Sequence, residues 1–273
     1  MTKEVLLVTG AGQIGLAIVR RMGYGKKIVI ATRRPEKAQE TLKTLTNAGF
    51  DAVVIPMDMA SRESIVNAVK IAQEYGPIKM LVNAAGVSPS QATIEQILQI
   101  DLLGTAILLE EVRKVIAPGG VGVTISSQSG WRMKQLTPEE DRALAMTPTE
   151  ELLGLEILRP ENIVNTLHAY QLAKRCNEKR VMYEAVEWGK RGARINDIAP
   201  GIIVTPLAVD EFNGLRGDFY SPLGYTGASA PFDRRGGIFI TVCPLPCQFP
   251  APAAGGRNSR RPLRRRPPGR WNR

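Results

Sequence analysis

The stretch TGAGQIG, residues 9–15, decides the fold class of this chain of 273 residues. It follows an apolar, β-branched run over residues 4–8 (EVLLV), which is typical of a buried strand. Residues 13–22 then carry apolar side chains at the spacing of a helix that packs on one face. A glycine-rich turn between a first strand and a first helix is typical of a doubly wound α/β domain.

The glycines of this turn form a GxGxxG array, and each has an expected role. Gly10 allows the tight turn, Gly12 lets backbone approach a pyrophosphate, and Gly15 lets the helix pack closely on the strand. The helix start, at Gln13 and Ile14, offers free N–H groups to phosphate oxygens. The array therefore predicts dinucleotide binding, and the alternative is a turn with a structural role only.

Strands and helices alternate beyond this turn. We expect strands at residues 26–34, 51–58, 78–86, 121–127 and 192–201. We expect helices at residues 35–48, 61–75 (capped by Ser61), 94–117 and 161–188 (opened by Pro160). A polar segment, residues 131–160, interrupts the alternation. The pattern predicts a Rossmann-like parallel sheet covered on both faces, in one domain over residues 1–230.

Composition fits a chain with one sizeable core, because 44% of its residues are hydrophobic and 23% are charged. No apolar run approaches the roughly 20 residues that span a bilayer, so we expect no membrane partner. Three cysteines provide no disulfide framework, which favours a cytoplasmic location. Cys243 and Cys247 have only His168 as a possible histidine co-ligand, so we expect no metal.

The basic charge is concentrated at the end of the chain. Residues 231–273 hold ten Arg, no Lys and one Asp, which accounts for +9 of the net charge of +10. Eight of the 19 prolines also lie there. Arg, Pro, Gly and Ala share G/C-rich codons, so we interpret this segment as an out-of-frame product, with a genuine basic tail as the alternative. We expect residues 249–273 to be disordered, residues 237–242 (GIFITV) alone to be able to pair with the sheet, and no specific nucleic-acid binding.

The end of the second predicted strand bears on the choice of cofactor. An NAD site would carry Asp or Glu there, to bind the ribose 2′-OH. Here the sequence reads Thr32, Arg33 and Arg34. A guanidinium suits a 2′-phosphate, so NADP(H) is the expected cofactor and NAD(H) the second choice. The alternative is a pair of solvated arginines.

Six short motifs, in this order, resemble those of the short-chain dehydrogenases/reductases over roughly residues 3–207. They are TGAGQIG (9–15), MDM (57–59), NAAG (83–86), ISSQSG (125–130), YQLAK (170–174) and APG (199–201). The resemblance implies that Tyr170 exchanges a proton with the substrate oxygen, that Lys174 assists it and reaches the nicotinamide ribose, and that Ser127 binds the same oxygen. An ordinary phenol has a pKa of about 10, and an ammonium one helical turn away stabilises the phenolate.

The resemblance also implies a set of cofactor contacts. They are Gly10, Gly12, Gln13, Ile14, Gly15, Arg33, Arg34, Asp58, Met59, Asn83, Ala84, Ala85, Gly86, Tyr170, Lys174, Pro200, Gly201, Ile203 and Thr205.

Two features depart from the family pattern. Asp101 stands where the family has a catalytic asparagine, and a carboxylate cannot donate a hydrogen bond as an amide does. Ser127 and Tyr170 are 43 residues apart, so residues 131–160 are an expected insertion, as in some bacterial hydroxysteroid dehydrogenases and carbonyl reductases. It could form a lid over the substrate or block a helix-face dimer contact. The family suggests a homo-oligomer, which the altered end of the chain puts in question.

The sequence thus predicts an NAD(P)(H)-dependent oxidoreductase that interconverts a secondary alcohol and a ketone on a fairly bulky, apolar small molecule. The alternative is a catalytically weak or silent dinucleotide-binding protein on the same fold. Intact Ser127, Tyr170 and Lys174 favour the enzyme.

Overall fold

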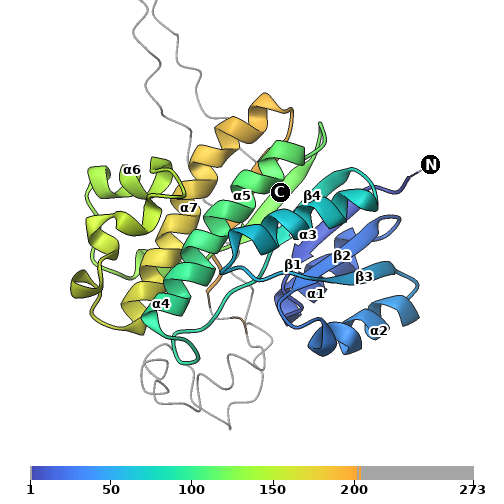
Figure 1. Cartoon of the computed structure of the whole chain (residues 1–273), viewed down its shortest axis with the longest axis horizontal. Coiled ribbons are helices and arrows are strands. Elements are labelled where there is room, and N and C mark those ends of the chain that lie inside the picture. The colour runs from blue at the N-terminus through green and yellow to red at the C-terminus, as the bar shows by residue number, and fades with distance from the viewer. Residues whose placement is uncertain (1, 202, 204–273) are drawn as a thin grey trace, which may run out of the picture. The chain divides into compact units, whose positions relative to one another are not determined.

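The computed structural model describes residues 2–201 and residue 203. Its framework is a six-stranded parallel sheet in the order β3-β2-β1-β4-β5-β6 (Figure 1). The strands are β1 Val5–Thr9, β2 Lys27–Thr32, β3 Asp51–Pro56, β4 Ile78–Asn83, β5 Val121–Ile125 and β6 Arg194–Ile198. This confirms the doubly wound parallel sheet that the alternation of strands and helices predicts. Residues 237–242, which alone in that segment are expected to be able to pair with the sheet, and the predicted disorder of residues 249–273 lie outside the described residues.

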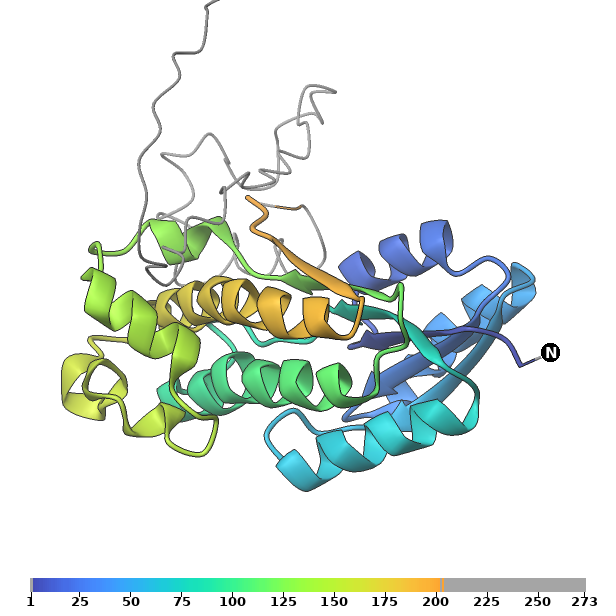
Figure 2. The ribbon, with the colours of Figure 1, turned by 90° about the horizontal axis from the view of Figure 1, so that it is seen from above.

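The two faces of β1 contact different layers of helices, because successive side chains of a strand point to opposite faces. Leu6 and Val8 pack in one apolar cluster with side chains of α1 (Gln13–Met22) and α2 (Gln39–Asn47). Val5 and Leu7 pack in another, with α3 (Arg62–Glu74), α5 (Gly104–Val115) and α7 (Thr166–Lys190). Figure 2 shows α1 (blue) and α3 (cyan) on opposite sides of the strands.

The helix predicted over residues 94–117 is divided into three parts. It begins as α4 (Ile94–Ile97), with a capping box formed by Thr93 and Gln96, and continues as the π-helix η2 (Leu98–Leu103) before α5. A Cβ at Gly104 would lie 2.2 Å from the carbonyl oxygen of Met59, so only glycine lets the helix approach the loop after β3 this closely. Residues 35–48 are also divided, into the 3₁₀-helix η1 (Pro35–Ala38) and α2.

The predicted start of the last helix is wrong. α7 begins at Thr166, because the side chain of Asn165 caps it by accepting a hydrogen bond from the backbone N–H of His168 at 3.0 Å. Pro160 instead opens a separate 3₁₀ turn, η6 (Pro160–Asn162). The prediction that Ser61 caps α3 is confirmed, since its hydroxyl accepts from the Ser64 N–H at 3.2 Å.

Residues 131–160 are more than a polar interruption. After η3 (Gln128–Trp131) they form α6 (Pro138–Met146) and the 3₁₀ turns η4 (Leu152–Gly154) and η5 (Glu156–Leu158). Leu144, Leu152 and Leu158 are buried in one apolar cluster with Leu172 and Cys176 of α7. The segment is therefore part of the core, and α6 lies beside α7 (Figure 1).

Within the described part of the chain, no helix is both long enough and apolar enough to cross a bilayer.

Candidate active site

The glycine-rich turn lies where the sheet order reverses, between the carboxyl ends of β1 and β4. Gly10 has a φ of +78°, and a Cβ there would be 3.1 Å from the Cα of Ala85 in the loop after β4. A Cβ at Gly15 would be 3.2 Å from Val8 and 3.5 Å from the Cβ of Ala84. Both positions thus require a small residue, because the glycine-rich turn and α1 lie close to β1 and to the loop after β4.

Gly12 is different, because nothing lies within 4 Å of the Cβ it lacks. It occupies the N-cap position of α1, and no side chain caps the helix there. The first turn, with Gln13 and Ile14, therefore presents backbone N–H groups beside open space. Such a terminus favours an anion.

Asn83 ties the two central strands together at this point. The Thr9 hydroxyl donates to Asn83 Oδ1 at 2.7 Å and accepts from the Ala85 N–H at 3.2 Å. The amide of Asn83 donates to Thr105 Oγ1 in α5 at 3.3 Å. The buried network holds the loop 83–86 in place against the glycine-rich turn.

The loop after β2 places Arg33 and Arg34 at the surface, and neither guanidinium forms an ion pair with another described residue. In the loop after β3, Asp58 Oδ1 accepts from the Ala60 N–H at 2.9 Å, while Met59 is buried. Both loops are at the carboxyl ends of the strands, on the same sheet edge as the glycine-rich turn.

A buried ion pair joins η2 to α7. Asp101 Oδ2 lies 3.3 Å from the Lys174 ammonium, and the two side chains are 0% and 6% exposed. Asp101 Oδ1 accepts from the Val87 N–H at 2.8 Å. A Cβ at Gly86 would lie 3.2 Å from the Asp101 carboxylate, so the sequence NAAG leaves the room that this side chain occupies.

Burial disfavours the charged form of both side chains, and each charge of this pair stabilises the charged form of the other. Burial alone would lower the pKa of Lys174, but the negative charge of Asp101 and the phenol of Tyr170 outweigh it and raise that pKa. Burial also raises the pKa of Asp101, while the Lys174 ammonium and the Val87 N–H oppose that shift. Lys174 is thus held as an ammonium at neutral pH.

The Lys174 ammonium lies 5.2 Å from the centre of the Tyr170 ring and 3.5 Å from the carbonyl oxygen of Ile125. Tyr170 is half-buried at the edge of the apolar cluster of α7 and residues 131–160. The four-residue spacing on α7 therefore does bring phenol and ammonium together, as the sequence predicts.

Ser127 begins the turn η3 directly after β5, and its hydroxyl accepts from the Ser129 N–H at 3.1 Å. A Cβ at Gly130 would be 2.8 Å from the backbone nitrogen of Arg175, so this turn packs against the backbone of α7 one residue past Lys174. The Gln128 N–H donates to the carbonyl of Pro200 at 3.0 Å, which joins the loops after β5 and β6. Gly201 and Ile203 follow in the described part, and Thr205 lies outside it.

Sequence reasoning missed two features of this region. The π-helix around Asp101 was missed, because the sequence pattern predicts one continuous helix there. Such π-helical turns are frequent at functional sites. A second pair of acids, the buried Glu178 and the partly buried Asp197, meets at the Ser126 hydroxyl. The one sequence signal for this pair of acids is the position of Glu178, four residues after Lys174, which places both side chains on one face of the helix.

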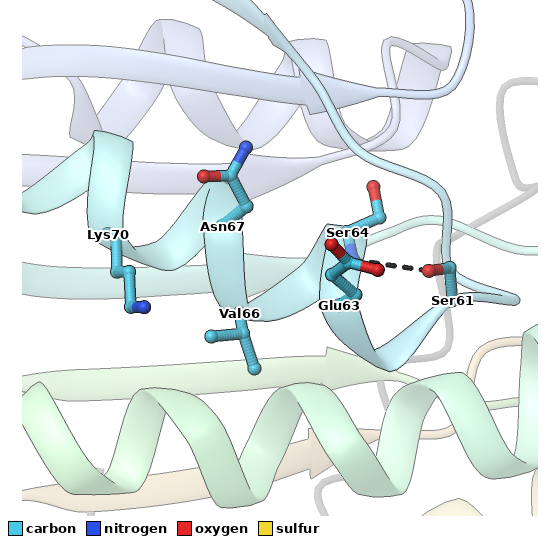
Figure 3. Close-up of a pocket in the computed structure, with 6 residues that line it drawn as sticks. All are labelled: Ser61, Glu63, Ser64, Val66, Asn67 and Lys70. Carbon is cyan, nitrogen blue, oxygen red and sulfur yellow. Dashed lines mark hydrogen bonds between the residues drawn. The ribbon is translucent and has the colours of Figure 1, made fainter.

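A separate hollow of about 380 Å³ follows the outer side of α3 (Figure 3). Its lining comes from one helix and its cap, and it contains none of the predicted site residues. The lining residues are Ser61, Glu63, Ser64, Val66, Asn67 and Lys70.

Two family models match the chain, one described as short chain dehydrogenase over residues 4–137 and one as enoyl-(acyl carrier protein) reductase over residues 136–223. The short-chain dehydrogenase/reductase bsc3 of Alternaria brassicicola is 36% identical over 208 residues, which are 76% of each chain. The chain belongs to the short-chain dehydrogenase/reductase family. This confirms the resemblance of the six motifs.

More distant relatives of this family member are also enzymes. The 7alpha-hydroxysteroid dehydrogenase of Bacteroides fragilis is 27% identical, over 77% of this chain and 75% of its own. The solved structure of an actinorhodin polyketide ketoreductase with NADPH has a TM-score of 0.60 at 25% identity, covering 82% of this chain and 78% of its own. The family places this chain among NAD(P)-dependent oxidoreductases that act on CH–OH groups.

Proposed function

We propose that this enzyme interconverts a secondary alcohol and a ketone on a fairly bulky, apolar substrate, with Tyr170 as the proton donor and acceptor. The observation that carries the proposal is the buried Lys174 ammonium, which is paired with Asp101 and lies 5.2 Å from the Tyr170 ring. An ammonium that keeps its charge beside a phenol favours the phenolate that forms when the phenol gives up its proton.

Each residue then has a defined task. In the reductive direction the Tyr170 hydroxyl donates its proton to the substrate carbonyl oxygen, and the Lys174 ammonium stabilises the phenolate left behind. The Ser127 hydroxyl donates a second hydrogen bond to the same oxygen. The nicotinamide, when bound, supplies the hydride chemistry. In the oxidative direction the phenolate accepts the proton of the alcohol.

Asp101 acts through Lys174 and is a positioning residue. As a carboxylate it accepts from Val87 and neutralises the ammonium, whereas an amide at this place could do only the first. Its pairing holds the Lys174 side chain of α7 against η2 and keeps the ammonium charged.

The described residues fit a dinucleotide at the carboxyl edge of the sheet. The uncapped start of α1 and the open space at Gly12 suit a pyrophosphate. Arg33 and Arg34 are exposed and unpaired among the described residues, which supports a 2′-phosphate and hence NADP(H), with NAD(H) as the second choice. The remaining predicted contacts in the loops 58–59, 83–86 and 200–203 lie at the same edge.

The proposal of a bulky, apolar substrate is based on the side chains around Tyr170. Partly buried Met133, Leu136 and Leu155 belong to the same apolar cluster as Tyr170. We propose that residues 131–160, with these side chains, form one wall of the substrate site. The hydroxysteroid and polyketide chemistry of the relatives named above supports a substrate of this class.

We also infer a cytoplasmic location, which the few cysteines support. Cys176 is a buried free thiol, and burial raises its pKa to about 11, so it has no role in the chemistry. Small molecules are the proposed partners, and no specific nucleic acid or membrane partner is proposed.

Tyr170→Phe tests the function, because it removes the hydroxyl and keeps the ring. We expect turnover across a panel of ketones to fall roughly 10²- to 10⁴-fold, while NADPH binding measured by fluorescence titration stays unchanged. Tyr183→Phe, on the same helix, is the control and should keep parental turnover. Equal activity of the two variants would exclude Tyr170 as the proton donor. A parent that binds NADPH but never turns over would support the silent alternative.

A further inference from the structure

Ser126 lies between two carboxyl groups that come from different elements. Its hydroxyl is in short hydrogen-bond contact with Oδ2 of Asp197 in β6, and Oε1 of Glu178 in α7 is 3.5 Å away. The carbonyl oxygen of Ile198 is a third acceptor, at 3.2 Å. A serine hydroxyl carries one hydrogen, so it cannot donate to all three.

The shortage of hydrogens matters because Glu178 and Ser126 are shielded from water, while Asp197 is partly buried. Glu178 and Ser126 are 8% and 3% exposed. With both carboxyls ionised, an oxygen of Glu178 would face the lone pairs of the Ser126 oxygen with no hydrogen between them, which is costly when buried. A proton on Glu178 removes the conflict, since Glu178 can then donate to Ser126 while Ser126 donates to Asp197.

The surrounding charges are consistent with one retained proton. Burial and the charge of Asp197 raise the pKa of Glu178 to about 7, although the Trp131 indole, Arg175 and Lys179 act in the opposite direction. Burial raises the pKa of Asp197 to about 6, against the Ser126 hydroxyl and the Lys174 ammonium. Arg175 and Lys179 are themselves paired with Asp141 of α6, which limits the compensation they give to Glu178.

We propose that Glu178 and Asp197 share one proton through Ser126, and that this hydrogen-bond chain positions the catalytic end of β5 against α7. The inference rests on the proposed function, because Ser126 precedes Ser127 and the charge of Asp197 interacts with that of Lys174. Glu178 and Asp197 are positioning residues, which act through these two neighbours. Loss of the proton leaves two like charges around Ser126 and separates the end of β5 from α7.

The shared proton can be observed without any substrate. Infrared difference spectra of the full chain, recorded as a pH titration, should contain the carbonyl stretch of a protonated carboxylic acid that disappears as pH rises through about 7. Glu178→Gln, whose amide can donate in place of the acid, should lack this band. Glu187→Gln, further along the same helix and paired with Lys190 at 2.6 Å, should keep it. A band absent from the parent would overturn the proposal.

The positioning role is read from the pH profile of ketone reduction. If the protonated pair is the active form, parental kcat should fall roughly tenfold from pH 6 to pH 8, and Glu178→Gln should remain near the parental pH 6 value throughout. Glu187→Gln should follow the parent. A Glu178→Gln profile that falls like the parent's would overturn the positioning role. Presence of the band without any turnover would instead refute the proposed function and leave the shared proton established.

Discussion

At the scale of single residues, the site depends on charges that are removed from water in pairs. Lys174 and Asp101 are both buried, and neither would keep its charge there alone. The carboxylate at position 101 therefore has a consequence that an amide would lack, since it fixes both the position and the charge of the ammonium beside Tyr170. We interpret the departure from the family asparagine as a different way to hold the same lysine.

We propose that single residues also decide the cofactor preference, and Arg33→Asp tests this proposal. The change replaces an exposed cation with the acid that would bind a ribose 2′-OH. We expect the preference for NADPH over NADH to fall roughly ten- to a hundredfold, because a charged hydrogen bond to the phosphate is lost. Binding constants for both cofactors, from fluorescence titration, give the ratio.

Arg20→Asp is the matched control, since Arg20 is an exposed arginine in the last turn of α1. It should leave the ratio unchanged. A parent that binds NADH more tightly than NADPH would contradict the role given to Arg33 and Arg34.

At the scale of elements, α6 and α7 are joined by a cluster of charged side chains. Asp141 of α6 accepts two hydrogen bonds from the Arg175 guanidinium, at 2.8 and 2.6 Å, and lies 3.0 Å from the Lys179 ammonium. The same guanidinium lies 3.9 Å from the centre of the Trp131 ring. Polar side chains of α7 are thus covered by α6 and η3.

Asp141→Asn tests this contact. The amide keeps the size of the side chain but loses the charge that pairs with Arg175 and Lys179, so we expect a loss of about 2 kcal/mol in the free energy of unfolding at pH 7. Urea denaturation followed by circular dichroism measures it. Glu139→Gln, an exposed carboxyl in the first turn of the same helix, is the control and should change stability by less than about 0.5 kcal/mol.

The effect should depend on pH in a defined direction. Burial alone would raise the pKa of Asp141, but the hydrogen bonds and charges of Arg175 and Lys179 outweigh it and hold that pKa below its ordinary value. A lowered pKa in the folded state contributes stability above the unfolded pKa of about 3.9, and this contribution is lost as the pH falls. The difference between parent and Asp141→Asn should therefore be constant near pH 7 and shrink below about pH 4. A difference that grows on acidification would show that another interaction is being measured.

At the scale of the whole molecule, the parallel sheet brings the predicted site residues to one edge. The turn after β1, the loops after β2 to β6 and the π-helix before α5 all supply predicted residues at the carboxyl edge. Parallel strands make this unavoidable, because the carboxyl end of every strand points the same way.

The distribution of arginine gives a prediction for the whole chain. Lys174, Arg175 and Arg180 are all buried in α7. Residues 257–270 lie outside the described residues and carry most of the arginines of the segment that the sequence predicts to be disordered, because it is rich in proline and charge. Brief trypsin treatment under native conditions should therefore cut first within residues 257–270 and leave residues 174–180 intact.

Mass spectrometry of the fragments identifies the order of cleavage. A chain that resists trypsin throughout residues 257–270 would contradict the interpretation of this segment as an out-of-frame product. Urea-unfolded chain, cut at both places with similar speed, is the control for intrinsic preference.

The sequence alone determined the class of the fold and the identity of the motifs. Apolar residues at the spacing of a strand or a helix, the glycine array and each of the six motifs involve residues that are close together in the chain. They can therefore be recognised in the sequence without the structure. These patterns were enough to predict the positions of the strands and the cap of α3 at Ser61. The start of α7 did not, because Asn165 competes with Pro160 for the helix start and only the folded chain shows which one wins.

Only the tertiary structure decided which polar groups are buried together. Asp101 and Lys174 are 73 residues apart. Asp141 comes from the segment that the sequence shows as a polar interruption, and it pairs with Arg175 of α7. Glu178 comes from α7, Ser126 from the loop after β5 and Asp197 from β6. Whether a carboxyl is ionised depends on its burial and on the charges within a few ångströms, and neither quantity is encoded in the residues next to it in the chain.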